Sequence, residues 1–346
     1  MTRKKLSVRE LAQLGGEERK EMLISGAKEE GKVTFYTSTA PEDIQSLLLA
    51  FDMRYPFIKA EMVRDKGVTI RERIIREYCG GGSPADVIEV NDLNLGKLKT
   101  RGFLCPYESP EADCYPNELR ESEGFWVAEQ KNFLVLAWNP HLVEEAAIPY
   151  DYDGLLDPRL KGKVTIEAHD ASWMAALITY WGEKKALDFF RSFGRQVGNV
   201  RVGHQIIAEQ IAAGSVALSP HIHSNNSEWL KRRSLPIDWR PLEPVETEFV
   251  GAALPVKPPH PHAALLLIDF ILSFEGQKIY RHWKRVPCHP AVEADPPYMS
   301  SGFESILFDA RAYLKRESEY EELWRELILE PSGHSAGDPR ATGPRI

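Results

Sequence analysis

Hydroxyl groups gather in the segment Thr37-Ser38-Thr39, at the joint between an apolar stretch and an amphipathic one. Thr39 and Glu42 have the spacing of a capping box, in which a hydroxyl closes the first turn of a helix. That role needs one of the three hydroxyls. The others would lie beside the free N–H groups of a helix N-terminus, which stabilise an anion or a polar ligand. We therefore expect this corner to contact a ligand, chiefly through Ser38.

Polar side chains follow other apolar stretches in the same way. Asn91 ends one such stretch, and it could either cap the next helix or reach a ligand. Later in the chain, Asp170 or Ser172 is expected to cap a helix, and Trp173 could form an apolar wall. Because ligands bind where strands end and helices begin, Asn91, Ser172 and Trp173 join the ligand-binding candidates.

Three histidines could bring imidazole groups to the second half of the chain. His204 opens a predicted helix, whose N-terminus disfavours a positive charge, so a neutral, hydrogen-bonding imidazole is expected; a surface role is the alternative. His221 and His223 would share one face if the strand before them continued. Two imidazoles could bind a divalent metal, but no third ligand is evident. A water-exposed loop, or hydrogen bonds to an organic ligand, is favoured over a metal site.

Motifs of several enzyme classes are missing. The chain has no H-E-x-x-H, no P-loop and no G-x-G-x-x-G sequence. No nucleophile–base pair stands out either. We therefore assign no catalytic residue and no cofactor, and we expect a binding protein rather than an enzyme.

The elements that must position these residues alternate between strands and helices, which is typical of α/β proteins with parallel sheets. The predicted strands cover 33–37, 58–63, 86–90, 133–139, 164–168, 199–202, 216–219, 237–240 and 249–256. The predicted helices cover 41–54, 69–79, 92–101, 171–182, 183–194, 204–213, 224–233, 260–273, 275–284 and about 309–329. Two α/β lobes follow from this order.

Length and composition limit the number of domains and the classes of partner that we expect for this chain. A chain of 346 residues exceeds what one compact core usually holds. The net charge is −8 without a Lys/Arg stripe, so nucleic acid is not an expected partner. No apolar run reaches the ~18 residues of a membrane helix, and no signal peptide is visible. Cys105 and Cys114 could close a short loop in an oxidising compartment.

We predict four parts along the chain. Residues 1–30 form a helical lead-in, and residues 331–346 form a disordered tail without core-forming side chains. The first α/β lobe combines 31–128 with 249–290. The second combines 129–248 with about 291–330.

Several runs together resemble a known family. They are "GAKEEGKVTFYTS", "FDMRYPFIKAEMVR", "GGSPADVIEVN", "LLDPRLKGKVTIE", "VGHQIIAEQIAAGSVAL" and "PHPHAALLLIDFILSFEGQ". In this order, over roughly 26–290, they resemble extracellular solute-binding proteins of ABC importers, in the branch that includes ferric-iron-binding proteins. The resemblance implies a two-lobed type II periplasmic-binding-protein fold with a hinge and an interlobe cleft. It also implies a monomer that delivers a small-molecule ligand to a membrane permease, in the periplasm or another extracytoplasmic space.

The sequence departs from the iron-binding members of that family. Where those members carry a tyrosine pair, this chain has Ile222-His223; their first-lobe histidine falls near Ala40 and their acidic ligand near Asn91. These departures argue against ferric binding by tyrosinate. The predicted function is capture of a small polar or anionic solute. The alternatives are import of iron or another metal, and an enzyme or biosynthetic protein of the cytoplasm with the same fold.

Overall fold

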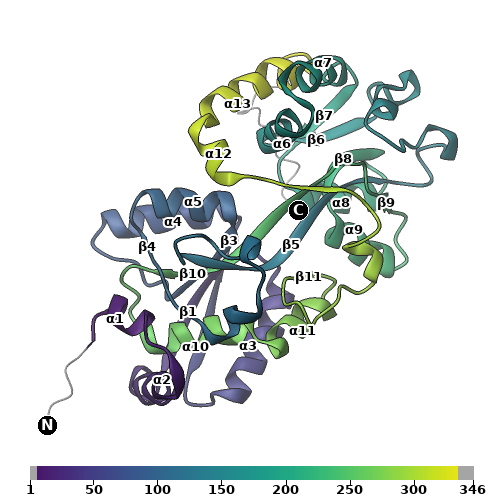
Figure 1. Cartoon of the computed structure of the whole chain (residues 1–346). Helices are drawn as coiled ribbons and strands as arrows, with labels where there is room; N and C mark the ends of the chain where they lie inside the picture. Colours follow the sequence, from purple (N-terminus) through teal and green to yellow (C-terminus); the bar gives the residue numbers. More distant parts are fainter. Residues whose placement is uncertain (1–5, 334–346) are drawn as a thin grey trace, which may run out of the picture. The chain divides into compact units, whose positions relative to one another are not determined.

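The computed structural model describes residues 6–333, which fall into two compact units (Figure 1). Unit 1 consists of Met1–Lys131 and Phe249–Asp295, and unit 2 consists of Asn132–Glu248 and Pro296–Ile346. Within the described part of the chain, no helix has the length and apolar character needed to cross a membrane.

Two strands belong in part to both units. They are β5 (Trp126–Trp138) and β10 (Val245–Pro255), and the chain also passes between the units after Asp295. The tail predicted at 331–346 lies outside the described residues from residue 334 onward, as do the first five residues of the lead-in.

Unit 1 is built on a sheet with the strand order β2-β1-β3-β10. β1 pairs in parallel with β2 and β3, while β10 runs antiparallel to β3. Short strands β4 and β11 pair with β10 and β5. These strands are β1 (Lys32–Thr37), β2 (Lys59–Arg64), β3 (Val87–Asn91), β4 (Leu104–Cys105) and β11 (Val286–Pro287).

Helices cover both faces of the unit 1 sheet, with α4 and α5 on one side and α2, α3 and α10 on the other (Figure 1). Their bounds are α1 (Val8–Ala12), α2 (Gly16–Glu30), α3 (Pro41–Arg54), α4 (Gly67–Cys79), α5 (Asp92–Thr100), α10 (Pro261–Leu272) and α11 (Phe274–His282), with short 3-10 helices η1 (Pro110–Cys114) and η2 (Asn117–Leu119). Because strand side chains alternate, Phe35 packs into one core and Tyr36 into the other. The apolar stripe predicted on α3 is buried in the first core: Ile44, Leu47, Leu48 and Phe51.

The capping box predicted for Thr39 and Glu42 is wrong. The N-cap of α3 is Ala40, and no side chain caps this helix. The Thr39 hydroxyl instead donates to Glu89 Oε1 at 2.7 Å. A buried carboxylate is a strong acceptor for the hydroxyl proton, so the Thr39 side chain turns inward instead of accepting from the N–H groups at the helix end.

Unit 2 contains a second sheet region in which β6 pairs in parallel with β7 and β8. β5 runs antiparallel to β8 and β9, and β12 pairs in parallel with the first residues of β10. These strands are β6 (Val164–Glu167), β7 (Val197–Arg201), β8 (Leu218–His223), β9 (Asp238–Arg240) and β12 (Ser305–Leu307).

An aromatic core joins the helices that cover this region. Trp173 of α6 packs edge-on against Phe190 and Phe193 of α7, and Trp324 of α13 donates its indole N–H to Ala168 O at 3.0 Å. The unit 2 helices are α6 (Ala171–Trp181), α7 (Glu183–Phe193), α8 (His204–Ala212), α9 (Ser224–Arg232), α12 (Ala310–Lys315) and α13 (Glu317–Trp324). Short 3-10 helices are η3 (Glu145–Ala147), η4 (Asp153–Leu156), η5 (Pro158–Leu160) and η6 (Pro297–Met299), and η7 (Arg325–Leu329) is a π-helix.

Three boundaries of helices and strands that the sequence predicts in unit 2 are wrong. The strand predicted at 216–219 is β8, which extends to His223. Pro220 is tolerated because the ladder to β5 is irregular at its position, so no regular ladder bond is lost. The strand predicted from residue 249 begins at Val245. The final helix breaks at Arg316, whose φ of −127° lies outside the helical region.

The four cysteines are free thiols in the structure, and the bridge between Cys105 and Cys114 that the sequence left open is not formed. Cys105 is buried, whereas Cys114 is exposed.

Candidate functional site

The carboxyl ends of three parallel strands in unit 2 bring polar side chains together. β6, β7 and β8 end at the same edge of the sheet and lead into α6, α8 and α9. Asp170 follows β6, His204 follows β7, and β8 supplies His221 and His223. This edge is where α/β sheets bind ligands, because strand ends and helix N-termini converge there.

These residues form a histidine–carboxylate cluster with two acids from β10, in which three members are buried and three half-buried: Asp170, His221 and Glu246, and His204, His223 and Glu248. Asp170 lies 3.0 Å from His204 Nε2 and 2.8 Å from His221 Nδ1. The other nitrogen of His221, Nε2, lies 2.9 Å from Glu246 Oε2. His223 Nε2 lies 3.7 Å from Glu248 Oε2. His221 is therefore held between two carboxylates.

Aromatic stacking fixes the planes of the imidazoles. Trp173 stacks on His221 with ring centroids 4.8 Å apart and an interplanar angle of 16°. His204 stacks on His223 at 4.6 Å and 30°. Trp173 is only 1% exposed, so it forms the apolar wall that the sequence suggested. The rings are oriented before any ligand arrives.

The electrostatics of the cluster favour charged imidazoles. Burial alone would lower the pKa of His221, but Asp170 and Glu246 outweigh it and raise that pKa to about 10. Burial likewise opposes charge on His204, yet Asp170 and Glu167 raise its pKa above the usual range. These carboxylates favour a charged His204, whereas its position at a helix N-terminus favours the neutral, hydrogen-bonding imidazole that the sequence predicts.

The pKa values of the cluster carboxylates are shifted in opposite directions. Burial would raise the pKa of Asp170, but His204 and His221 hold it below its usual range. Burial also opposes the charge of Glu248, and His223 lowers its pKa nevertheless. For Glu246 burial prevails over His221, and its pKa is raised. Acids with opposed shifts in one small volume are typical of functional sites.

Some polar atoms beside the cluster are left unsatisfied. Among the described residues, Glu246 Oε1 and Ser224 Oγ are buried and have no hydrogen-bond partner. A buried acceptor or donor without a partner costs roughly 1–3 kcal/mol. These atoms are therefore places where a bound solute or water would gain a hydrogen bond.

The cluster has the donor set of a metal site. One ligand atom each from Asp170, His204 and His221 lies within 4.8 Å of the others. Imidazole and carboxylate donors suit first-row transition metals. A metal ion would replace the protons that these groups now share in hydrogen bonds.

In unit 1 the hydroxyl corner after β1 turns mostly inward. Thr37 donates to Glu89 Oε2, and Gln130 Nε2 donates to both Thr39 Oγ1 at 3.1 Å and Glu89 Oε1 at 3.0 Å. The Ser38 N–H donates to the Glu89 carbonyl, while its residue stays partly exposed. Of the three hydroxyl residues, Ser38 is the one that the structure leaves accessible to a ligand.

Asn91 follows the first of its two predicted roles. It is the N-cap of α5, and its Oδ1 accepts from the Asn94 N–H at 3.2 Å and from Asn94 Nδ2 at 2.6 Å. Asn94 Oδ1 in turn accepts from Arg71 at 2.7 Å. The Asn91 side chain is thus occupied within unit 1.

Comparison with known proteins decides the family. The sequence model of a family described as "Bacterial extracellular solute-binding protein" matches residues 83–301, more than half of the chain. The chain belongs to this family. An uncharacterised protein of Haemophilus influenzae is 28% identical over 280 residues, which cover 76% of this solute-binding protein and 79% of the relative.

Solved structures agree on the fold. The periplasmic binding protein AfuA from Actinobacillus pleuropneumoniae, with fructose-6-phosphate bound, has a TM-score of 0.76 at 20% identity and covers 86% of this chain and 99% of its own. Iron-bound HitA from Pseudomonas aeruginosa has a TM-score of 0.73 at 22% identity with the same coverage. The periplasmic binding protein P5PA has 0.75 at 19%, again with that coverage. The α/β, two-lobed type II periplasmic-binding-protein fold implied by the resemblance is confirmed.

The family assignment confirms that this chain is a solute-binding protein of the ABC-importer type. Its class is one of binding and transport rather than catalysis. One G-x-S-x-G sequence occurs at residues 333–337, and all of it but Gly333 lies outside the described part of the chain.

The structure brings some predicted residues together and leaves others apart. His204, His221, His223 and Trp173 share the cluster, and Ser172 lies buried in the first turn of the adjoining α6. The candidates Thr37, Ser38, Thr39 and Asn91 belong to unit 1.

The sequence reasoning missed several acids. Asp170 was expected to cap α6, but it makes no cap bond and instead holds two histidines. Glu246 and Glu248 fall between the predicted strands 237–240 and 249–256 and were not singled out. Their i, i+2 spacing, on the face of a strand that begins at Val245, was the signal that could have revealed them.

Proposed function

We propose that this solute-binding protein captures its solute at the histidine–carboxylate cluster, and that the solute brings a metal ion to Asp170, His204 and His221. The observation that carries the proposal is the grouping of these three ligand atoms within 4.8 Å. The protein would act in the periplasm and pass the metal, as cargo, to an ABC permease. The "extracellular" class of the family supports this location and partner.

Charge supports a cationic solute. With Glu167, the cluster contains four carboxylates beside three imidazoles, and burial limits the help that water can give. Like charges in one buried site cannot all ionise without positive charge among them. Protons on His204 and His221 supply that charge without a solute. A metal ion would supply it more compactly, with the acids as ligands or hydrogen-bond acceptors.

The residues around the cluster also support binding of a metal ion. Carboxylates that bond to histidine rings, as Glu246 does to His221 Nε2, orient metal-ligating imidazoles in many proteins. The Trp173 ring excludes water from one face of His221. Glu246 Oε1 and Ser224 Oγ, which lack partners within the described chain, could bond to water or organic groups that accompany the metal.

A second candidate is an anionic solute, such as a phosphorylated compound. Helices α6, α8 and α9 begin at the cluster without side-chain caps, so their free N–H groups could bind anionic oxygens. The structure of AfuA contains fructose-6-phosphate. Four nearby carboxylates weigh against this candidate unless the histidines stay protonated.

Equilibrium dialysis with metal analysis tests the proposal. Purified protein, stripped with a chelator, is dialysed against Zn²⁺, Mn²⁺ or Fe³⁺, and separately against fructose-6-phosphate. We expect about one metal ion per chain and a loss of affinity of at least tenfold in His204→Gln, because one ligand of three is lost. His141→Gln is the matched control, since His141 is exposed and distant from the cluster in sequence.

Two outcomes would contradict the metal proposal. One is no metal uptake by the wild-type protein. The other is equal uptake by the wild type and the His204→Gln variant. Binding of fructose-6-phosphate without metal, lost in the same variant, would instead establish the second candidate at the same cluster.

A further inference from the structure

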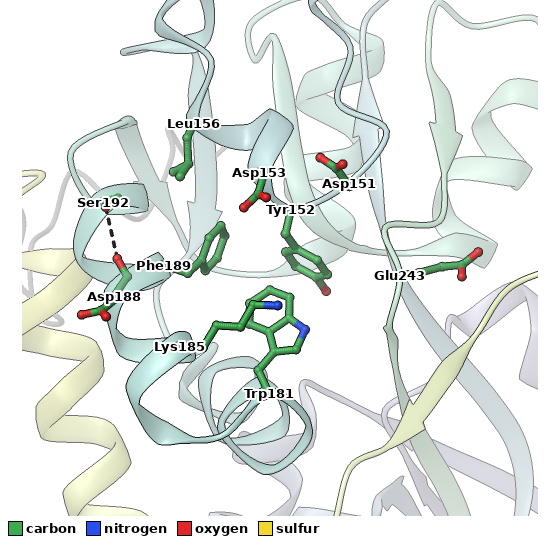
Figure 2. A pocket seen from close by; sticks show the side chains of 10 residues that line it. All are labelled: Asp151, Tyr152, Asp153, Leu156, Trp181, Lys185, Asp188, Phe189, Ser192 and Glu243. Atoms are coloured by element: carbon green, nitrogen blue, oxygen red, sulfur yellow. Dashed lines mark hydrogen bonds between the residues drawn. The ribbon is translucent and has the colours of Figure 1, made fainter.

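Unit 2 contains a hollow of about 400 Å³ that takes no part in the histidine–carboxylate cluster (Figure 2). We call it the η4–α7 pocket, and its lining includes Asp151, Tyr152, Asp153, Trp181, Lys185 and Phe189. Its volume lies within the ~300–1,000 Å³ range of small-molecule sites. The question is which chemistry would fill it.

Three aromatic rings line it, those of Tyr152, Trp181 and Phe189. Tyr152 meets Trp181 at 4.9 Å and 86°, and it meets Phe189 at 5.6 Å and 88°. Trp181 and Phe189 are themselves 5.6 Å apart at 81°. The Tyr152 hydroxyl donates to Pro244 O at 3.0 Å, which fixes the ring in place. In a perpendicular pair the positive edge of one ring meets the negative face of the other, and the face of Trp181 is the one over which a cation of the chain lies.

Carboxylates without positive partners line the same hollow. Within residues 6–333, no ion pair neutralises Asp151, Asp153 or Glu243. Asp188, by contrast, is already paired with Lys184 at 3.0 Å and Arg191 at 2.8 Å. Figure 2 shows the Asp153 carboxylate between the rings of Phe189 and Tyr152. The hollow therefore combines aromatic faces with unneutralised negative charge.

A cation of the protein itself already lies over one of these aromatic rings. The ammonium group of Lys185 lies 4.7 Å from the centroid of the Trp181 ring. Lys185 is exposed, so its flexible side chain can leave without disturbing the core. Its position shows which chemical group the ring face of Trp181 accepts.

We infer that the η4–α7 pocket binds a small alkylammonium compound, with its positive group over Trp181 and beside Asp153. This site is separate from the one proposed for the imported solute. A ligand of this class would displace the Lys185 ammonium from the ring face and would place a second positive charge near the unpaired acids. The chain would thus have two ligand sites within unit 2.

Isothermal titration with choline tests the inference, and 3,3-dimethyl-1-butanol is the control ligand. The two molecules have the same shape, but carbon replaces the charged nitrogen in the second. We expect choline to bind at least about tenfold more tightly, because cation–π and carboxylate attraction act on the charge alone. No detectable choline binding, or equal binding of both compounds, would overturn the inference.

Variants locate the binding. Asp153→Asn should weaken choline about fivefold, and Trp181→Leu should abolish its advantage over the neutral compound. Lys185→Met should strengthen choline binding, since the competing ammonium is removed. Lys278→Met is the matched control, because Lys278 also lies over an aromatic ring, that of Phe274 at 5.5 Å, but in unit 1.

These variants also separate the two sites. Each should keep the wild-type melting temperature within a few degrees and the wild-type metal uptake. Choline binding that is unchanged in both Asp153→Asn and Trp181→Leu would place the ligand elsewhere and refute the pocket. If Trp181→Leu unfolds, Asp153→Asn together with Lys185→Met still tests whether choline binds in this pocket. Both of these side chains lie at the surface, so their replacement should leave the protein folded.

Discussion

At the scale of single residues, buried carboxylates are the partners of several polar side chains that the sequence singled out. Glu89 accepts hydrogen bonds from the hydroxyls of Thr37 and Thr39, and Asp170 contacts the imidazoles of His204 and His221. The sequence could predict that these residue types stand at strand ends. It could not predict their partners, because Glu89 is some fifty residues away from the hydroxyls and only the paired strands bring them together.

Glu129 offers a test of a buried acid at this scale. It is fully buried, and burial together with the charge of Glu89 raises its pKa well above the ordinary range. Its folded pKa exceeds its unfolded value, so its contribution to stability is present below pH 4.5 and is lost as the pH rises through the folded pKa. Glu129→Gln keeps the neutral form at every pH.

We therefore expect Glu129→Gln to raise the free energy of unfolding at pH 8, and to leave it nearly unchanged near pH 4.5. Urea unfolding at a series of pH values measures this. Glu118→Gln serves as the control, because Glu118 is exposed. A variant as stable as the wild type at pH 8, or less stable, would show that Glu129 is charged and compensated in the folded protein.

At the scale of elements, the alternation of strands and helices was predictable, and the ends of the strands were not. The apolar stripe of α3 and the βαβ order of β1, α3 and β2 follow from local periodicity. The start of β10 at Val245 and the end of β8 at His223 depend on pairing with distant strands. The start of β10 carries Glu246 and Glu248, so that missed boundary hid two of the six cluster residues.

Close packing between α7 and η7 gives a prediction at this scale. Gly194 ends α7 with helical φ, so alanine would suit its backbone, but a Cβ there would collide with the carbonyl oxygen of Leu327. We expect Gly194→Ala to lower the free energy of unfolding by about 1–3 kcal/mol, since backbone cannot move as a flexible side chain does. Thermal unfolding measures the loss.

Gly15→Ala is the control for that substitution. A Cβ on Gly15 would meet no atom within 4 Å, and its φ is in the extended region. This variant should match or slightly exceed the stability of the wild type. If Gly194→Ala behaves in the same way, the contact between α7 and η7 is looser than the structure shows.

At the scale of the whole molecule, two compact units each place polar groups at the carboxyl ends of parallel strands. The family resemblance predicted this two-lobed fold from the order of its motifs, although no single motif is specific. The hinge and interlobe cleft that the same resemblance implies stay predictions. The identity of the solute was beyond the sequence, because it depends on side chains that only folding brings within bonding distance.

X-ray absorption spectroscopy of the zinc-loaded protein tests the central claim most directly, that the histidine–carboxylate cluster receives the metal. The account predicts two imidazole nitrogens and a carboxylate oxygen at ~2.0–2.2 Å from the zinc, with the imidazole signal reduced in His204→Gln. A shell of sulfur at ~2.3 Å would instead implicate the free cysteines. That result, or a shell without imidazole, would contradict the account.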